Sequence, residues 1–276
     1  RRIGSIVTAL TEATPLFAHE GSTYTATEMA RGPWAPRHCH GGPVGALLAR
    51  AAEQADDGGV DWHVARLTIE LTRPVPVLTP LELKVVVERP GRKVSLVGGV
   101  LRDGDTEVAI VRALRIRSAD VALPIETDLP HEDPMASPES ATWVQHDMTG
   151  MGLIAFHSHA CEHRFAKGTW DEPGPAEVWI RLTSPVVADE MPSGTQSAAA
   201  AADFGNGVSG ALPYDKFIFI NPDLTVYLTR PVQGEWVGMR SASHYSSVGS
   251  GLAESALFDA NGRVGRSCQS LFVDPR

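Results

Sequence analysis

The chain has 276 residues, 43% hydrophobic and 21% charged, an ordinary composition for a globular protein with one large or two ordinary domains. Its net charge of −9 disfavours a nucleic-acid partner, and no apolar run approaches the ~18–20 residues that a membrane span needs. Three widely spaced cysteines, Cys39, Cys161 and Cys268, argue against a disulfide framework. We therefore expect a reducing, cytoplasmic location and no secretory signal.

The first clear element is a helix that follows the segment "HCHGGPVGALLARAAE" at 38–53. From Val44 onward, apolar residues recur at i, i+3, i+4, i+7 and i+8, which predicts one buried helix face, and Gly58-Gly59 is expected to close the helix. Gly41 and Gly42 leave the helix start bare. A ligand can approach the unpaired N–H groups of such a first turn closely.

Alternating β-branched residues predict strands at 66–75, 81–88, 94–101 and 108–116, and later at 178–182, 224–230, 236–244, 252–258 and 264–273. An alanine-rich helix is expected at 196–203, between the two sets of strands. Residues 118–150 are rich in proline, serine and acids, which is typical of a linker.

The two sets of strands share a repeated segment. "RLTIELTRPV" at 66–75 and "DLTVYLTRPV" at 223–232 agree at seven of ten positions. Each copy follows a helix with a glycine near its start and precedes further strands. We expect an α+β protein with one repeat at 1–117, a linker at 118–150 and a second repeat at 151–276.

These features together resemble the acyl-CoA thioesterase II type of double-hotdog thioesterases. The resemblance rests on "HGGPVGALLARA", "AAAADF", "INPDLTVYLTRP", "EWV" and "GLAESALFDANGRVGRSCQSLFV", and it spans roughly Phe17 to Val273. It implies two fused hotdog repeats, each an antiparallel sheet wrapped around a long helix. It also implies a role in lipid metabolism, an acyl-CoA substrate and no cofactor or metal, and such folds often form homo-oligomers.

The family uses an Asp on the second helix, a Thr on the following strand and a Gln on the last strand to position a water. Asp203 matches the first and Gln269 the third. Asn221 occupies the place of the Thr, and Thr225 lies four residues further on, so either residue is a candidate for that role. In the repeat, Asp203 falls opposite Ala51 and Gln269 opposite Ala113. We therefore expect that one half carries the acid–amide chemistry.

The resemblance implies hydrolysis of a fatty acyl-CoA by direct attack of water. Asp203 is the expected general base, Gln269 with Thr225 or Asn221 orients the water, and the first helix turn receives the carbonyl oxygen. His40, Gly41, Gly42 and Val44 are the expected substrate-binding residues. Close packing of the helix against the sheet is the other interpretation of Gly41 and Gly42.

Three other sequence patterns bear on different kinds of site: a metal site, a dinucleotide-binding site and a serine nucleophile. His157, His159, Cys161 and His163 would share one face of a strand, as zinc ligands can. An ordinary edge strand also suits this pattern, and the resemblance to the thioesterase family, which needs no metal, disfavours zinc. "GNGVSG" at 205–210 fits a dinucleotide-binding pattern but follows a helix, so we expect a helix stop and a loop. No G-x-S-x-G is present, which disfavours a serine nucleophile.

Two other functions stay open. A non-catalytic acyl-thioester binding protein would keep the same pocket. A hotdog enoyl-CoA hydratase needs a His–Asp pair, and no histidine is near Asp203 in the sequence.

Overall fold

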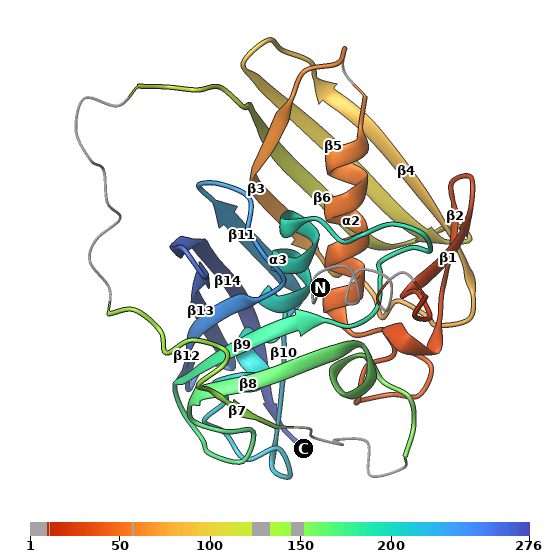
Figure 1. The fold of residues 1–276 in the computed structure, drawn as a ribbon. Coiled ribbons are helices and arrows are strands. Elements are labelled where there is room, and N and C mark those ends of the chain that lie inside the picture. The colour runs from red at the N-terminus through yellow and green to blue at the C-terminus, as the bar shows by residue number, and fades with distance from the viewer. Residues whose placement is uncertain (1–9, 11, 57, 123–132, 145–151) are drawn as a thin grey trace.

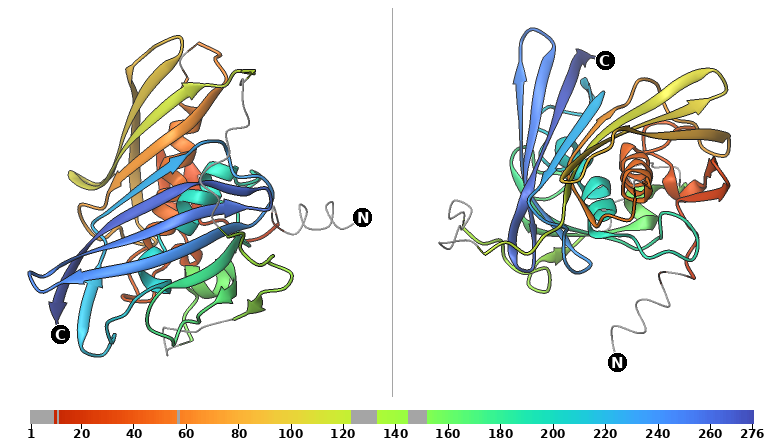
Figure 2. Two further views of the ribbon diagram at one scale, coloured as in Figure 1. Left: turned by 90° about the vertical axis from the view of Figure 1, so that its left-hand side faces the viewer. Right: turned by 90° about the horizontal axis from the view of Figure 1, so that it is seen from above.

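A computed structural model describes residues 10, 12–56, 58–122, 133–144 and 152–276 of the chain. Two similar halves stand side by side, one built around helix α2 and the other around helix α3 (Figure 1). Seen from above, each helix lies against the concave side of a curved antiparallel sheet (Figure 2). This arrangement matches the α+β double-hotdog architecture expected from the sequence.

The helices are α2 Gly41–Gln54, α3 Gly194–Ala202 and the short α4 Gly205–Val208, with a 3-10 turn at Glu28–Ala30 and a π-helical turn at Phe156–Ala160. The strands are β1 Phe17–Glu20, β2 Thr23–Ala26, β3 Trp62–Glu70, β4 Pro80–Arg89, β5 Val94–Asp103, β6 Thr106–Arg117, β7 Thr142–Trp143, β8 Cys161–Lys167, β9 Ala176–Leu182, β10 Phe217–Ile220, β11 Asp223–Leu228, β12 Val237–Ser246, β13 Ser250–Asp259 and β14 Gly262–Pro275.

The two repeated segments meet where the halves join. Strands β3 and β11 pair antiparallel with Thr68 directly opposite Thr225, so one sheet runs continuously from the first half into the second. Thr68 also pairs with Arg112 on β6, while Thr225 pairs with Cys268 on β14. The two halves therefore use equivalent registers, which places Ala113 and Gln269 at matching positions as the repeat predicted.

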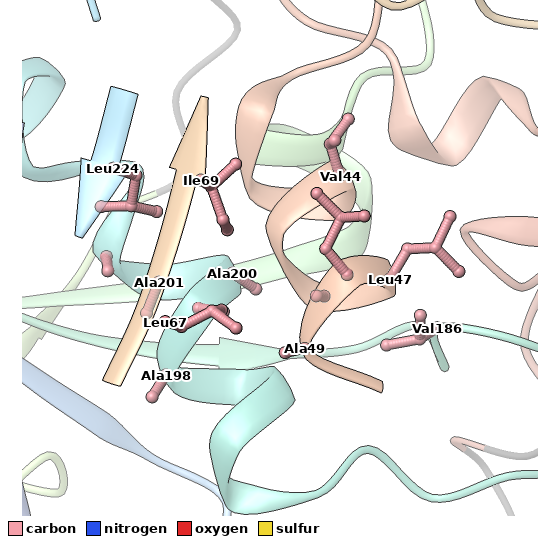
Figure 3. Packing of buried hydrophobic residues seen from close by; sticks show 14 of the residues in the cluster. Val44, Leu47, Ala49, Leu67, Ile69, Val186, Ala198, Ala200, Ala201 and Leu224 are labelled. Carbon is pink, nitrogen blue, oxygen red and sulfur yellow. The ribbon is translucent and has the colours of Figure 1, made fainter. Parts of the chain in front are cut away.

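Helices α2 and α3 pack against each other inside the sheet, and small residues at their contact allow a close approach (Figure 3). The alanines of α3 are buried, and a Cβ atom on Gly42 of α2 would lie 2.7 Å from the Ala200 carbonyl oxygen. That distance is too short for any real Cβ atom, so Gly42 is required by helix packing. Close packing therefore accounts for Gly42, but against helix α3 and not against the sheet as the sequence analysis expected.

Each predicted strand overlaps an observed one, but several predicted boundaries are wrong. Helix α2 ends at Gln54, before Gly58-Gly59, and β3 and β11 end before their Thr-Arg-Pro-Val segments. Residues 205–208 of "GNGVSG" form the helical turn α4 instead of a loop. Within the expected linker, 123–132 and 145–150 lie outside the described residues, and the remainder contains β7, which pairs with β8.

The period-two pattern of histidines is also broken. His157 and His159 lie on the π-helical turn, and β8 begins only at Cys161, so the side chains do not share one strand face. Among the described residues, no group of His, Cys, Asp or Glu side chains is placed to hold a metal ion. The same part of the chain has no helix that is long and apolar enough to cross a membrane.

Candidate active site

Asp203 terminates helix α3 and lies against the start of helix α2. A Cβ atom on Gly41 would lie 2.6 Å and 2.7 Å from the two carboxylate oxygens of Asp203, so glycine is needed there for the carboxylate to fit. The Asp203 side chain is only 5% exposed. The sequence-predicted acid and the sequence-predicted helix start thus meet at one place, although they are far apart in the chain.

Three side chains hold the Asp203 carboxylate. Asn221 donates from Nδ2 to Oδ1 at 2.7 Å, and His40 Nδ1 lies 2.8 Å from Oδ2. Gln269 Nε2 lies 3.5 Å from Oδ1 and donates to the main-chain oxygen of Asp203 at 3.2 Å. Burial alone would raise the pKa of Asp203, but the His40 ring, the Asn221 amide and the Gly42 N–H outweigh it and lower the pKa. Asp203 is therefore an ionised carboxylate at neutral pH.

The groups that surround His40 indicate which of its two ring nitrogens carries the proton. The Gly42 N–H lies 3.1 Å from Nδ1, which would need an unprotonated nitrogen, whereas the Asp203 oxygen at 2.8 Å needs a protonated one. We assign the proton to Nδ1, because the carboxylate is closer and charged. The Gly42 N–H then supports Asp203, and Nε2 of His40 has no hydrogen-bond partner among the described residues.

The first turn of α2 offers few free amides. Pro43 has no N–H, and the Gly42 N–H is directed to Asp203. Within the described part of the chain, no group accepts a hydrogen bond from the Gly41 N–H. Of the two glycine amides expected to receive a carbonyl oxygen, only that of Gly41 is left for this role.

Gln269 is buried on β14, 1% exposed, and both ends of its amide are used. Its Nε2 contacts Asp203, and its Oε1 accepts the Asn206 N–H at 3.0 Å. This amide therefore ties Asp203 to the short helix α4. Gln269 positions the carboxylate and does not present a free donor to a water.

The structure separates the two candidates for the threonine role. Asn221 lies in the loop before β11 and contacts Asp203 directly. Thr225 lies inside β11, between buried Leu224 and Val226 whose side chains face the helices, so its own side chain faces the outer side of the sheet. A spacing of four residues would place Asn221 and Thr225 on one face if both lay in the same strand, but Asn221 precedes β11.

A cavity of about 390 Å³ opens beside Asp203. Its wall includes the substrate-binding residues expected from sequence, His40, Gly41 and Val44, whereas Gly42 is buried behind them. Apolar side chains form much of the remaining wall: Trp34, Leu71, Trp170, Phe204, Phe219 and Ile220. A mostly apolar space with one buried carboxylate is suited to an acyl chain that ends in a reactive carbonyl.

The sequence analysis missed the partner of Asp203. His40 was expected to bind substrate, and the absence of a nearby histidine counted against a His–Asp pair. That inference is wrong, because the fold brings the end of α3 to the start of α2. The ring of His40 also packs against Phe204, with centroids 4.7 Å apart, and against Phe156 at 5.2 Å, so it is held in place on two sides.

Two family models match most of the chain. Residues 30–116 match the family model of the acyl-CoA thioesterase N-terminal domain, and residues 129–273 match that of the C-terminal domain. Among curated proteins, no match was found.

Solved structures share the fold at low sequence identity. A hot dog-fold protein of unknown function from Alicyclobacillus acidocaldarius is 14% identical, with a TM-score of 0.71 over 96% of this chain and 97% of that one. The tesB protein of Mycobacterium avium subs paratuberculosis is 17% identical, with a TM-score of 0.66 over 100% of both chains. Acyl-CoA thioesterase II TesB2 of Mycobacterium marinum is 14% identical, with a TM-score of 0.64 over 99% of this chain and 98% of its own.

Proposed function

Because this chain belongs to the acyl-CoA thioesterase family and is a thioester hydrolase, we propose that it hydrolyses a fatty acyl-CoA to free acid and coenzyme A at the Asp203 centre, by direct attack of water. The observation that carries the proposal is the buried Asp203–His40 pair at the wall of an apolar cavity. A cytoplasmic location and assembly into a homo-oligomer stay predictions from the sequence.

The contacts of Asp203 favour His40 as the group that takes the proton from water. A carboxylate has about four acceptor sites, and Asn221, Gln269, His40 and the Gly42 N–H already occupy them. A carboxylate with a lowered pKa is also a weak base. Asp203 then holds the Nδ1 proton of His40 and stabilises the imidazolium, while the free Nε2 accepts the proton of the attacking water.

The carbonyl oxygen becomes negatively charged as water attacks. The Gly41 N–H at the start of α2 is the donor that is available to it, and the positive end of the helix dipole adds to the stabilisation. The tetrahedral intermediate then collapses, the carbon–sulfur bond breaks, and the proton on His40 neutralises the departing thiolate. Asn221 and Gln269 keep Asp203 in place through these steps.

The test is a panel of acyl-CoA substrates of increasing chain length, assayed by thiol release with the wild type, Asp203→Asn, His40→Gln and the double variant. General bases contribute about 10²–10⁴ in rate, so each single variant is expected to lose at least about a hundredfold in kcat. Because the two residues act as one unit, the double variant should be little worse than either single variant.

Two results would contradict this mechanism. Full activity of His40→Gln with loss of activity in Asp203→Asn would make Asp203 the base by itself. Absence of thiol release from every substrate with the wild type would favour the acyl-thioester binding protein. Tight binding of acyl-CoA by an inactive wild type would then identify that function.

The His40–Asp203 contact also favours a second candidate, enoyl-CoA hydration, because that chemistry uses such a pair to activate water. The discriminating measurement is the loss of enoyl absorbance from a trans-2-enoyl-CoA with no release of thiol. The family match favours hydrolysis, so we expect thiol release to dominate with both saturated and unsaturated substrates.

A further inference from the structure

Arg73 and Arg230 occupy the same place in the two copies of the repeated segment Leu-Thr-Arg-Pro-Val. In both segments the threonine hydroxyl donates a hydrogen bond to a main-chain carbonyl oxygen of a neighbouring strand. The Thr72 hydroxyl donates to the Glu107 carbonyl oxygen at 2.6 Å, and the Thr229 hydroxyl donates to the Val264 carbonyl oxygen at 3.0 Å. Any difference between the two arginines therefore comes from their side-chain surroundings.

The second arginine is engaged inside the protein. Arg230 makes a two-pronged ion pair with Asp259, whose side chain is fully buried, and one of the two bonds measures 2.9 Å. Such a forked pair fixes the guanidinium in one orientation. Arg230 thus has a structural role at the β13–β14 hairpin.

The first arginine is free of such a partner. Arg73 is exposed, and its Nη1 donates to the carbonyl oxygen of Thr72 at 2.7 Å. In the described part of the chain no carboxylate pairs with it, and its side chain lines the cavity that holds Asp203. A guanidinium that keeps free N–H groups at the wall of a substrate cavity is suited to an anionic part of the substrate.

A second arginine lies near this segment. Residues 37–39 run beside residues 75–77: the Cys39 N–H donates to the Val75 carbonyl oxygen at 2.8 Å, and the Val77 N–H donates to the Arg37 carbonyl oxygen at 3.0 Å. Arg37 is exposed but does not line the cavity. Among the described residues that line the cavity, Arg73 is the only Lys or Arg and Asp203 is the only Asp or Glu, so Arg73 is the cation there that an anionic group of a ligand would meet.

A flat apolar surface lies beside this cation. Trp34 lines the cavity although it is 58% exposed, and its ring stacks on Tyr214 with centroids 5.8 Å apart. An exposed indole held by a second aromatic ring offers a face on which a planar group can stack. An arginine beside a stacking surface fits a phosphorylated nucleotide better than a hydrocarbon.

We propose that Arg73 binds a phosphate of the coenzyme A portion of the substrate. The inference rests on the proposed function, because it takes the substrate to be an acyl-CoA whose thioester reaches Asp203. A carboxylate at the far end of the acyl chain is the other anion that would suit Arg73, and substrates that lack the phosphates separate the two.

The experiment compares the wild type, Arg73→Gln and a matched control, Arg92→Gln. Arg92 is exposed in the turn between β4 and β5 and does not line the cavity, so the control removes the same charge elsewhere. Each protein is assayed with one acyl-CoA, its 3′-dephospho form and the corresponding acyl-pantetheine. Calorimetry with coenzyme A alone measures binding without turnover.

We expect Arg73→Gln to lower the ratio of kcat/KM for acyl-CoA over acyl-pantetheine by about tenfold, mainly through KM, and to weaken binding of coenzyme A by a similar factor. The loss should shrink at high salt, because the pair is exposed. A smaller loss with the 3′-dephospho substrate would assign the contact to the 3′-phosphate, and an equal loss would assign it to the pyrophosphate. Arg92→Gln should leave the ratio unchanged.

The inference is overturned if Arg73→Gln impairs acyl-CoA and acyl-pantetheine equally, which would place Arg73 against the acyl chain or in a structural role. It is also overturned if the variant binds coenzyme A as the wild type does. Failure of the wild type to hydrolyse any substrate would contradict the proposed function alone, because the calorimetric comparison still tests Arg73.

Discussion

Acid should destabilise this protein through His163, a buried residue of β8 that contacts Phe204 and Trp170 of the cavity wall. The side chain is 3% exposed and packs edge-on against Phe204, with ring centroids 4.8 Å apart, and against Trp170 at 5.1 Å. Its Nε2 is buried without a hydrogen-bond partner among the described residues. Burial, with smaller contributions from His157 and His40, lowers the pKa of His163 to about 3.

The sign of the effect follows from where the proton binds. A histidine in the unfolded chain titrates near pH 6.5, so between about pH 6.5 and 3 the unfolded chain holds a proton that folded His163 lacks. Stability therefore falls as the pH falls through that window, by about 1.4 kcal/mol for each pH unit. Between pH 6.5 and pH 5 this amounts to about 2 kcal/mol of unfolding free energy.

The assay is urea unfolding at pH 7, 6 and 5 for the wild type, His163→Phe and the exposed control His244→Asn. Phenylalanine suits an aromatic pocket and has no proton to bind, so His163→Phe should lose about 2 kcal/mol less than the wild type between pH 7 and pH 5. The control should keep the wild-type slope. Parallel curves for the wild type and His163→Phe would refute the assignment of acid sensitivity to His163.

Three further predictions concern the site and its support. Gly41→Ala places a Cβ atom 2.6 Å from an Asp203 oxygen, so the carboxylate must shift. We expect kcat/KM to fall by roughly 10–100-fold while the thermal unfolding temperature changes little. Unchanged turnover would show that the position of the Asp203 carboxylate does not matter for activity. Asn221→Thr should keep more activity than the similarly shaped Asn221→Val, because only threonine retains a donor for Asp203, and equal kcat values would remove Asn221 from the mechanism. Buried Arg115 donates to the Ala52 and Ala55 carbonyl oxygens at the end of α2. Arg115→Met should therefore lower the unfolding free energy measured in denaturant titrations by about 2–4 kcal/mol. A loss below about 0.5 kcal/mol would contradict this structural role of Arg115.

The sequence predicted the architecture well because the fold is duplicated. The two Leu-Thr-Arg-Pro-Val segments follow strands that pair with each other, and Thr68 and Thr225 meet at the centre of that pairing. A pattern that recurs in two copies fixes the order and register of the strands around it. Asp203 and Gln269 were predicted from the family resemblance, and the repeat added that the first copy has Ala51 and Ala113 at the corresponding places.

What the sequence could not provide is contact between the copies. His40 caps the start of α2 and Asp203 ends α3, so their meeting depends on how the two helices cross, and no local pattern records that. The symmetry of the duplication was the one available signal, because it brings the start of each helix to the end of the other. Likewise the π-helical turn at Phe156–Ala160 interrupts a pattern that alternation alone predicts as a strand.

The same symmetry creates a second helix junction, and its chemistry explains why one end of the helix pair is suited to catalysis. At this junction Glu53, near the end of α2, meets the start of α3, so the first copy does contain an acid, although not at Ala51, the residue that the repeat places opposite Asp203. Its carboxylate accepts the Ser193 hydroxyl at 2.8 Å and the Gln196 amide at 3.1 Å.

That second helix start is closed to a ligand. A Cβ atom on Gly194 would lie 2.1 Å from the Val232 carbonyl oxygen, so the main chain itself covers the first turn of α3. Ala113 also stands at the position that Gln269 holds in the other half, and it supplies no amide to orient an acid. At the Asp203 end the corresponding space is the cavity, and a histidine takes the N-cap position that a serine holds in α3. A serine hydroxyl is a poor base, whereas an imidazole nitrogen can accept a proton from water, so we infer that hydrolysis takes place at the His40 end.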